Sequence, residues 1–141
     1  MTPPKTKKGI PTVLVVEDDE LILDLMLQKL TKEKFNMLVA KEGEKAFELL
    51  GAQKPDLIVL DIILPGMNGF EILEKLKSAE STKSIPVIIL SNLGQQEEIE
   101  RGLKLGAEKF YIKAHVIPND ITEIINEALE VQKQKSLAAA K

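Results

Sequence analysis

The segment Leu57–Phe70 reads LIVLDIILPGMNGF and joins an apolar run, an acid and a turn signal within fourteen residues. Four apolar residues lead into Asp61, and three more follow before Pro and Gly mark a turn. A buried carboxylate is costly unless something compensates it. Asp61 therefore either emerges where a strand ends or has partners elsewhere in the sequence.

Composition indicates one globular domain: the chain has 141 residues, and 44% of them are hydrophobic. A net charge of −3 argues against a nucleic-acid partner. The chain has no cysteine, which excludes disulfides and thiolate metal sites and fits a reducing cytosol. The apolar runs are too short to span a bilayer, and the N-terminus lacks a hydrophobic signal region. We expect a cytoplasmic protein without a membrane partner.

Short β-rich apolar runs alternate along the chain with segments of helical spacing. The runs predict strands at Thr12–Val16, Asn36–Ala40, Leu57–Leu60, Val87–Leu90 and Lys109–Ile112. The spacing predicts helices at Glu20–Glu33, Glu42–Leu50, Gly69–Lys77, Gln95–Lys104 and from Pro118 to about Val131. The first helix is apolar nearly all round, so we expect it to be deeply packed. Ile117 is expected on the apolar face of the last helix.

This alternation, with strands that read as continuous apolar runs, is typical of a parallel sheet covered on both faces. The fold class is therefore α/β, built from five βα units. In such open sheets the functional crevice lies beyond the carboxyl ends of the strands. The residues at those ends are Glu17, Asp18 and Asp19 after the first strand, Asp61 after the third, Ser91 and Asn92 after the fourth, and Lys113 after the fifth.

Carboxylates gathered at one edge repel each other unless positive charge is supplied. Lys113 and a hard divalent cation are the two plausible sources, and Mg²⁺ prefers carboxylate oxygens, a carbonyl and retained waters. A carboxylate beside a metal and an ammonium, with a hydroxyl nearby, is suited to accepting a phosphoryl group as an acyl phosphate. The residue types predict Asp61 as the nucleophile.

The spacing of these residues resembles the receiver domain of two-component response regulators, the CheY-like family. The marks are Glu17 and Asp18 after LVV, Asp61 in LDIILPGMNG, Ser91 thirty residues later and Lys113 a further twenty-two on. The resemblance covers residues 10–131 and implies a doubly wound, flavodoxin-like (βα)5 sheet with strand order 2-1-3-4-5. Residues 1–9 are then read as a flexible basic arm and 132–141 as a C-terminal tail or frayed helix end.

The resemblance also implies a metal site and a phosphoryl donor. Asp61 would be phosphorylated by a sensor histidine kinase or a phosphotransfer protein. Asp18 would bind Mg²⁺ directly and Glu17 would bind it through water. The backbone carbonyl of Ile63 would complete the protein's share of the coordination sphere.

Three further roles follow from the same resemblance. Lys113 would hold the phosphoryl oxygens, Ser91 would hydrogen-bond the phosphoryl group, and Phe110 would be the aromatic residue whose rotamer reports the switch. Phosphorylation would alter the face formed by the helix at 95–104, the strand at 109–112 and the helix at 118–131.

The implied function is that of a single-domain response regulator in a phosphorelay. The segment after the last helix is too short for an output domain, so the output is expected from the domain surface, through a downstream protein or a phosphorylation-dependent homodimer. Its own chemistry would be limited to self-phosphorylation and slow autodephosphorylation, so we do not expect an enzyme.

The sequence departs from the family pattern in three respects, and each departure leads to a prediction. Lys113 is followed by Ala114 where most members have proline, so either a cis bond is held under strain or the loop runs differently. Asn92 stands where a small residue is common and is expected to slow small phosphodonors. Ile63 and Leu93 stand where many members are polar and should position an attacking water poorly, which predicts a long-lived phosphoryl group.

Several of these residues also fit simpler roles, and two other protein classes share part of the pattern. An Asp before Pro and Gly is often only a turn residue, Asp19 alone is an ordinary helix cap, and Phe110 has a core role besides any switching role. A receiver that binds partners without phosphorylation predicts a missing site residue, and none is missing. A haloacid dehalogenase phosphatase needs D-x-D, whose second position here is Ile63. The chain has no Walker loop and no GxGxxG.

Overall fold

The computed structural model describes residues 9–32 and 35–139, so the predicted basic arm lies, except for Gly9, outside the described residues. Five strands and five α-helices alternate along this part of the chain, with a short 3₁₀ helix before the last α-helix. The strands are β1 Thr12–Val16, β2 Asn36–Ala40, β3 Leu57–Leu60, β4 Val87–Ser91 and β5 Lys109–Ile112. The helices are α1 Glu20–Lys32, α2 Gly43–Ala52, α3 Gly69–Ser78, α4 Gln96–Lys104, η1 Lys113–His115 and α5 Pro118–Ala139.

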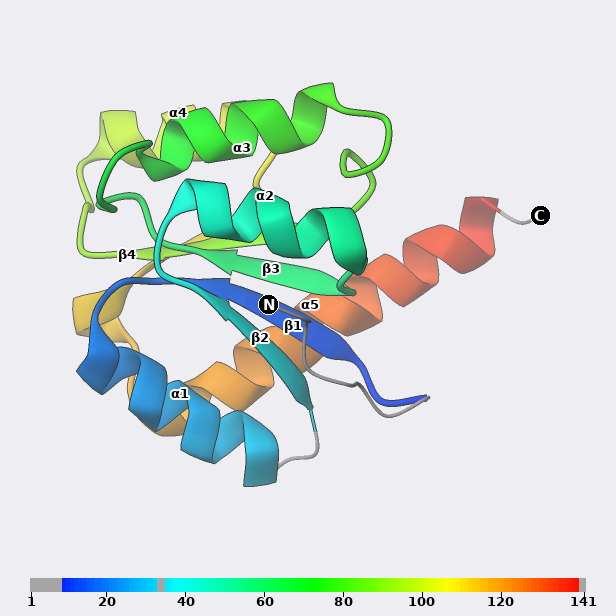
Figure 1. Ribbon diagram of the computed structural model, residues 1–141, viewed down its shortest axis with the longest axis horizontal. Helices are drawn as coiled ribbons and strands as arrows, with labels where there is room; N and C mark the ends of the chain where they lie inside the picture. The colour runs from blue at the N-terminus through cyan, green and yellow to red at the C-terminus, as the bar shows by residue number, and fades with distance from the viewer. Residues whose placement is uncertain (1–8, 33–34, 140–141) are drawn as a thin grey trace.

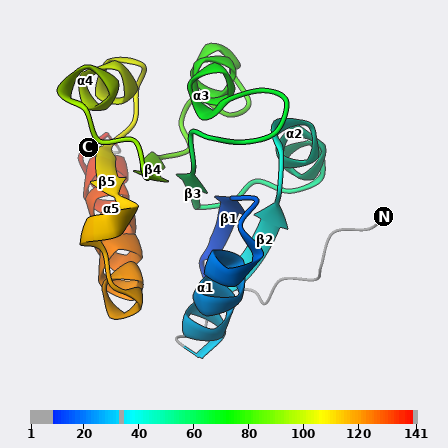
Figure 2. The ribbon, with the colours of Figure 1, turned by 90° about the vertical axis from the view of Figure 1, so that its left-hand side faces the viewer.

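The strands form one parallel sheet in the order β2-β1-β3-β4-β5, which confirms the order implied by the resemblance (Figure 2). The central strands β1, β3 and β4 are buried along their whole length, as continuous apolar runs predict. The order reverses at β1, because β2 lies on one side of it and β3 on the other. The carboxyl ends of β1 and β3 therefore adjoin.

Helices cover both faces of the sheet. Helices α1 and α5 lie on one face and α2, α3 and α4 on the other (Figures 1 and 2). Two apolar clusters fill the spaces between the sheet and these layers. One contains the inward residues of α2 and α3, and the other those of α1 and α5. The layered arrangement fixes the strand ends that carry the candidate site.

The expectation that α1 is deeply packed is wrong. Leu21, Leu25 and Leu27 are 70%, 41% and 45% exposed, whereas Leu23, Met26 and Leu30 are buried. The physical reason is that α1 covers the sheet from outside, so only one stripe of its surface meets the core. Its remaining leucines form part of the protein surface.

Helix α5 continues to Ala139, beyond the end near Val131 that the sequence predicts. Residues 133–138 are all exposed, and the end of the helix leaves the domain opposite the carboxyl ends of the strands (Figure 1). Ile117 precedes α5 and is 58% exposed, so it does not join the apolar face expected for it. Among the described residues, no helix combines the length and apolar character needed to cross a membrane.

The loop after β5 differs from the proline-containing pattern of the family. Residues Lys113–His115 form a 3₁₀ turn that the Val116 N–H closes by donating to the Lys113 carbonyl at 3.1 Å. No peptide bond among the described residues is cis. The sequence left two alternatives for Lys113–Ala114, a strained cis bond or a loop with a different path. The structure has the loop with a different path.

Candidate functional site

Parallel pairing brings three predicted residues to one edge of the sheet. Glu17, Asp61 and Lys113 each follow directly on a strand, namely β1, β3 and β5. The Glu17 N–H donates to the Ala40 carbonyl at 2.9 Å, and the Asp61 N–H donates to the Val16 carbonyl at 3.0 Å. These backbone bonds continue the ladder past the strand ends and hold both acids in register.

One ammonium serves two buried carboxylates. Lys113 Nζ lies 2.9 Å from Asp61 Oδ2 and also forms an ion pair with Glu17 Oε1. Glu17 and Asp61 are only 3% and 5% exposed. The counter-charge that the sequence requires is therefore present as Lys113, which confirms that these residues come together.

Backbone donors hold the remaining carboxylate oxygens. Glu17 Oε2 accepts from the N–H groups of Asp18 and Asp19, and Asp61 Oδ1 accepts from the Ile62 N–H at 2.7 Å. Asp19 Oδ1 accepts from backbone N–H groups in the first turn of α1, as a helix cap does. The two buried acids are thus fixed in orientation, while Asp19 has the structural role expected of it.

Burial and ion pairing have opposite effects on the pKa values of Glu17 and Lys113. Burial raises the pKa of Glu17 to about 7, and outweighs the hydrogen bond from Lys113 that lowers it. Burial alone would lower the pKa of Lys113, but hydrogen bonds to Glu17 and Asp61 hold it above its ordinary value. Lys113 therefore carries its charge, and Glu17 titrates near neutrality.

The acids also form a candidate metal centre. Glu17, Asp18 and Asp61 each offer an oxygen, and these oxygens all lie within 4.8 Å of one another. Two of the three residues are buried and Asp18 is exposed, so the cluster opens toward solvent. Hard carboxylate donors with an open side fit Mg²⁺, which keeps several of its waters.

Ser91 and Phe110 lie on the strands beyond Asp61. Ser91 ends β4 and is completely buried, and its Oγ accepts a long hydrogen bond of 3.4 Å from the Leu93 N–H. Phe110 is partly buried on β5 and packs with the core under α2, α3 and α4. The side chain of Ile63, in the loop after Asp61, is 59% exposed.

The loop after Asp61 returns to it at the start of α3. The Gly69 N–H donates to the Ile62 carbonyl at 2.8 Å, and Asn68 Oδ1 caps α3 by accepting from the Glu71 N–H. A Cβ built on Gly69 would lie 2.2 Å from the Asp61 carbonyl oxygen, closer than any side chain can approach. The sequence suggested that Gly69 only shapes a turn. The structure shows that a glycine is needed here because the backbone approaches the Asp61 carbonyl so closely.

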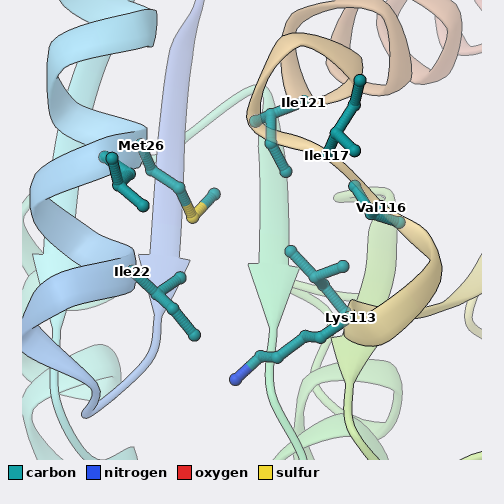
Figure 3. Close-up of a pocket in the computed structure, with 8 residues that line it drawn as sticks. Ile22, Met26, Lys113, Val116, Ile117 and Ile121 are labelled. Atoms are coloured by element: carbon teal, nitrogen blue, oxygen red, sulfur yellow. The ribbon is translucent and has the colours of Figure 1, made fainter.

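Sequence reasoning missed an apolar pocket of about 220 Å³ between α1 and the β5–α5 loop. Figure 3 shows Ile22 and Met26 on one wall, Val116, Ile117 and Ile121 on the other, and Lys113 extending across its mouth. The exposed Leu25 completes the rim on the α1 side. No local pattern could reveal it, because its walls are far apart in the sequence.

Comparison with known proteins supports the same interpretation. The sequence model of the response regulator receiver domain matches residues 13–127. The transcriptional regulatory protein AfsQ1 of Streptomyces coelicolor is 35% identical over 74% of this chain and 45% of its own length. The two-component response regulator ORR5 of rice, Oryza sativa subsp. japonica, is 34% identical over 86% of this chain and 90% of its own.

The fold is likewise shared with a solved structure. A CheY-like response regulator receiver domain protein from Methanospirillum hungatei is 28% identical, with a TM-score of 0.82 over 90% of this chain and 99% of that one. The chain spans less than half the length of AfsQ1 and of two other bacterial regulators, and most of the rice protein. It thus corresponds to one part of the longer relatives.

Proposed function

The chain belongs to the response regulator receiver domain family of two-component systems, and from this we propose that it accepts a phosphoryl group on Asp61. The observation that carries the proposal is the single ammonium of Lys113 between two buried carboxylates. An Asp that only shaped a turn would not need a buried counter-ion. The arrangement holds an oxygen nucleophile beside a fixed positive charge at the open edge of the sheet.

The transfer itself is a displacement at phosphorus. An Asp61 carboxylate oxygen forms the new O–P bond as the P–N bond of a phosphohistidine breaks, and the donor imidazole takes the electron pair and then a proton from water. Lys113 would pair with the phosphoryl oxygens, and Ser91 would donate a hydrogen bond to one of them. The chain's own chemistry would be limited to this self-phosphorylation and to slow hydrolysis of the acyl phosphate.

We include Mg²⁺ in the proposed reaction because the carboxylate oxygens at the site suit this ion. Asp18 and Asp61 would hold the ion, Glu17 would bind it through water, and the Ile63 carbonyl would supply one more oxygen. When bound, the ion neutralises charge on the transferring phosphoryl group. Ile63 and Leu93, two residues after Asp61 and Ser91, offer no polar group to a hydrolytic water, which supports the expectation of a long-lived phosphoryl group.

We assign the phosphoryl donor to a histidine kinase or phosphotransfer protein that contacts the apolar pocket. A donor that reaches Asp61 must approach past Lys113, and Lys113 lines that pocket. Leu25 and Ile117 also line the pocket, and both are exposed, so they fit an apolar helix face of the donor. With any protein donor that labels the chain, Ile117→Glu should slow transfer while labelling by acetyl phosphate stays normal.

The output would be a changed surface of α4, β5 and α5. Movement of Ser91 toward the phosphoryl group would free space near Phe110, and the face that these elements form would then bind a downstream protein or a second copy. We place the transfer in the cytoplasm, because a chain without cysteine fits a reducing compartment.

Intact-mass measurement with acetyl phosphate and magnesium tests the proposal. The native chain should gain one phosphoryl group, Asp61→Asn should gain none, and Asp24→Asn, a change at an exposed acid of α1, should behave as native. Chelation should abolish the gain. If acetyl phosphate fails, the same measurement is made with a histidine phosphotransfer protein, because Asn92 can hinder small donors. No gain with either donor would favour a receiver that binds partners without phosphorylation.

A further inference from the structure

Two adjacent residues of α4 rest on two aromatic rings from different parts of the fold. The guanidinium carbon of Arg101 lies 4.3 Å from the centroid of the Phe70 ring, at the start of α3. Gly102 faces Phe110 of β5, since a Cβ built on Gly102 would lie 3.1 Å from Phe110 Cδ2 and 2.6 Å from Ile89 Cδ1. The contact of Arg101 with Phe70 is a cation–π interaction. The close approach of Gly102 to Phe110 is possible because glycine has no side chain.

Few other contacts fix α4. Gly102 is its one buried residue, and the other residues of Gln96–Lys104 are exposed or partly exposed. By contrast, α3 buries five residues, among them Phe70. Figure 2 shows α4 at the outer edge of the layer, above β4 and β5. The two rings, with Ile89, are therefore among the contacts that position this helix.

Both rings are attached to segments that carry site residues. Phe70 directly follows Gly69, whose α-carbon lies against the Asp61 carbonyl. Phe110 lies on β5, three residues before Lys113, which directly follows that strand. A displacement of the loop after Asp61 would move one ring, and a displacement at the end of β5 would move the other.

We propose that Arg101 and Gly102 are positioning residues that couple α4 to the state of Asp61. This inference rests on the proposed phosphorylation. In this structure Lys113 pairs with Glu17 and Asp61, so a phosphoryl group would compete with these carboxylates for the ammonium. Ser91 accepts a hydrogen bond from the Leu93 N–H, and would have to orient its O–H toward the phosphoryl group. The ring contacts of α4 stabilise the arrangement in which those pairs exist. Weakening them shifts the equilibrium toward the arrangement that the phosphoryl group favours.

A charge-matched pair of variants tests Arg101. Arg101→Met and Lys104→Met each remove one positive charge from α4, but only the first removes a cation from a ring. The probe is beryllofluoride with magnesium, a phosphoryl mimic that binds carboxylates, titrated by calorimetry against the full chain. A cation–π contact of this kind corresponds to about a two- to fivefold change in affinity. Arg101→Met should bind the probe more tightly by that factor, and Lys104→Met should bind as native.

A second matched pair tests Gly102. Gly102→Ala places a methyl group against Ile89 and Phe110, while Gly51→Ala fills open space on α2. Both replacements favour helix, so α4 itself is not weakened by the change. Gly102→Ala should shift beryllofluoride affinity in the same direction as Arg101→Met, and Gly51→Ala should leave it unchanged.

Hydrogen exchange of the α4 amides gives a readout that a purely structural role would not move. Beryllofluoride should change α4 exchange in the native chain, and this response should shrink in Arg101→Met and Gly102→Ala. A native chain that binds the probe without any α4 response, or variants that match their controls in affinity, would overturn the coupling and leave the proposed function intact. A native chain that binds no probe and gains no phosphoryl group would overturn both.

Discussion

Lys113 Nζ lies 2.9 Å from Asp61 Oδ2 although 52 residues separate them along the chain, and the same ammonium pairs with Glu17. The fold thus places one cation between two acids that are nearly inaccessible to water. Removing one partner of a buried ionic cluster leaves uncompensated charge. The site is therefore held together by the group that the proposed reaction would use.

Lys113→Met should destabilise the chelated protein by about 3 kcal/mol, because two buried carboxylates lose their counter-ion. Magnesium should restore much of this loss, since the ion supplies the missing positive charge. Urea denaturation in chelator and in excess magnesium measures both effects. Lys109→Met, a change at an exposed lysine at the start of β5, is the control. A loss that magnesium leaves unchanged would mean that the acids and the ion do not share a site.

The stability of the chelated protein should depend on pH through Glu17. Its pKa of about 7 in the folded protein, against an ordinary 4.5, means that the folded chain holds a proton that the unfolded chain releases. This contribution is complete below pH 4.5 and is lost as pH rises through 7. It amounts to about 3 kcal/mol at most.

Glu17→Gln removes the titrating group and isolates the effect. Relative to the native chain, the variant should become progressively more stable between pH 5.5 and 8 in chelator. Denaturation curves at matched pH values give the difference between the two chains. A constant difference would show that Glu17 has the same charge across this range.

Ile63→Gln should shorten the lifetime of the phosphoryl group by about threefold or more, because a polar side chain near Asp61 can orient an attacking water. Leu137→Gln, at a similarly exposed position on α5, should have no effect. Loss of the phosphoryl mass with time, after removal of the donor, measures both rates. Native protein that loses its phosphoryl group within seconds would contradict the expected slow hydrolysis.

Gly69→Ala should destabilise the protein by about 3 kcal/mol, at the upper end of overpacking costs, because its Cβ would meet the Asp61 carbonyl at 2.2 Å. Backbone atoms cannot turn aside as the end of a side chain can. Gly51→Ala should instead stabilise α2 by up to about 1 kcal/mol, since open space surrounds it. Thermal denaturation of the two variants compares them directly. Equal stabilities would refute a requirement for the bare α-carbon at Gly69.

The strand pattern was predictable because burial on both faces leaves a direct signal in the sequence. Each predicted strand agrees with the structure to within one residue, and Ser91 merely extends β4. The convergence of Glu17, Asp61 and Lys113 followed from parallel topology, since residues after parallel strands share an edge. Sequence order and strand direction were enough for this part of the site.

The surface of the helices was less predictable. Apolar residues all round α1 indicated deep burial, but a single outer layer can bury only one stripe, so Leu21, Leu25 and Leu27 remain exposed. The pairing of Lys113 with Glu17, and the contact of Arg101 with Phe70, depend on side-chain conformations that no local pattern encodes. The boundary at residue 131 between the receiver domain and a C-terminal tail stays a prediction, although α5 continues beyond it.

The exposed last turns of α5 have a practical use. The chain has no cysteine, so a thiol introduced at Leu137 would be unique and, at 52% exposure, open to reagents. It would stand near the end of α5 that leaves the domain opposite the carboxyl ends of the strands (Figure 1). A fluorophore attached there would report rotational diffusion, and hence self-association, without obstructing the acidic edge.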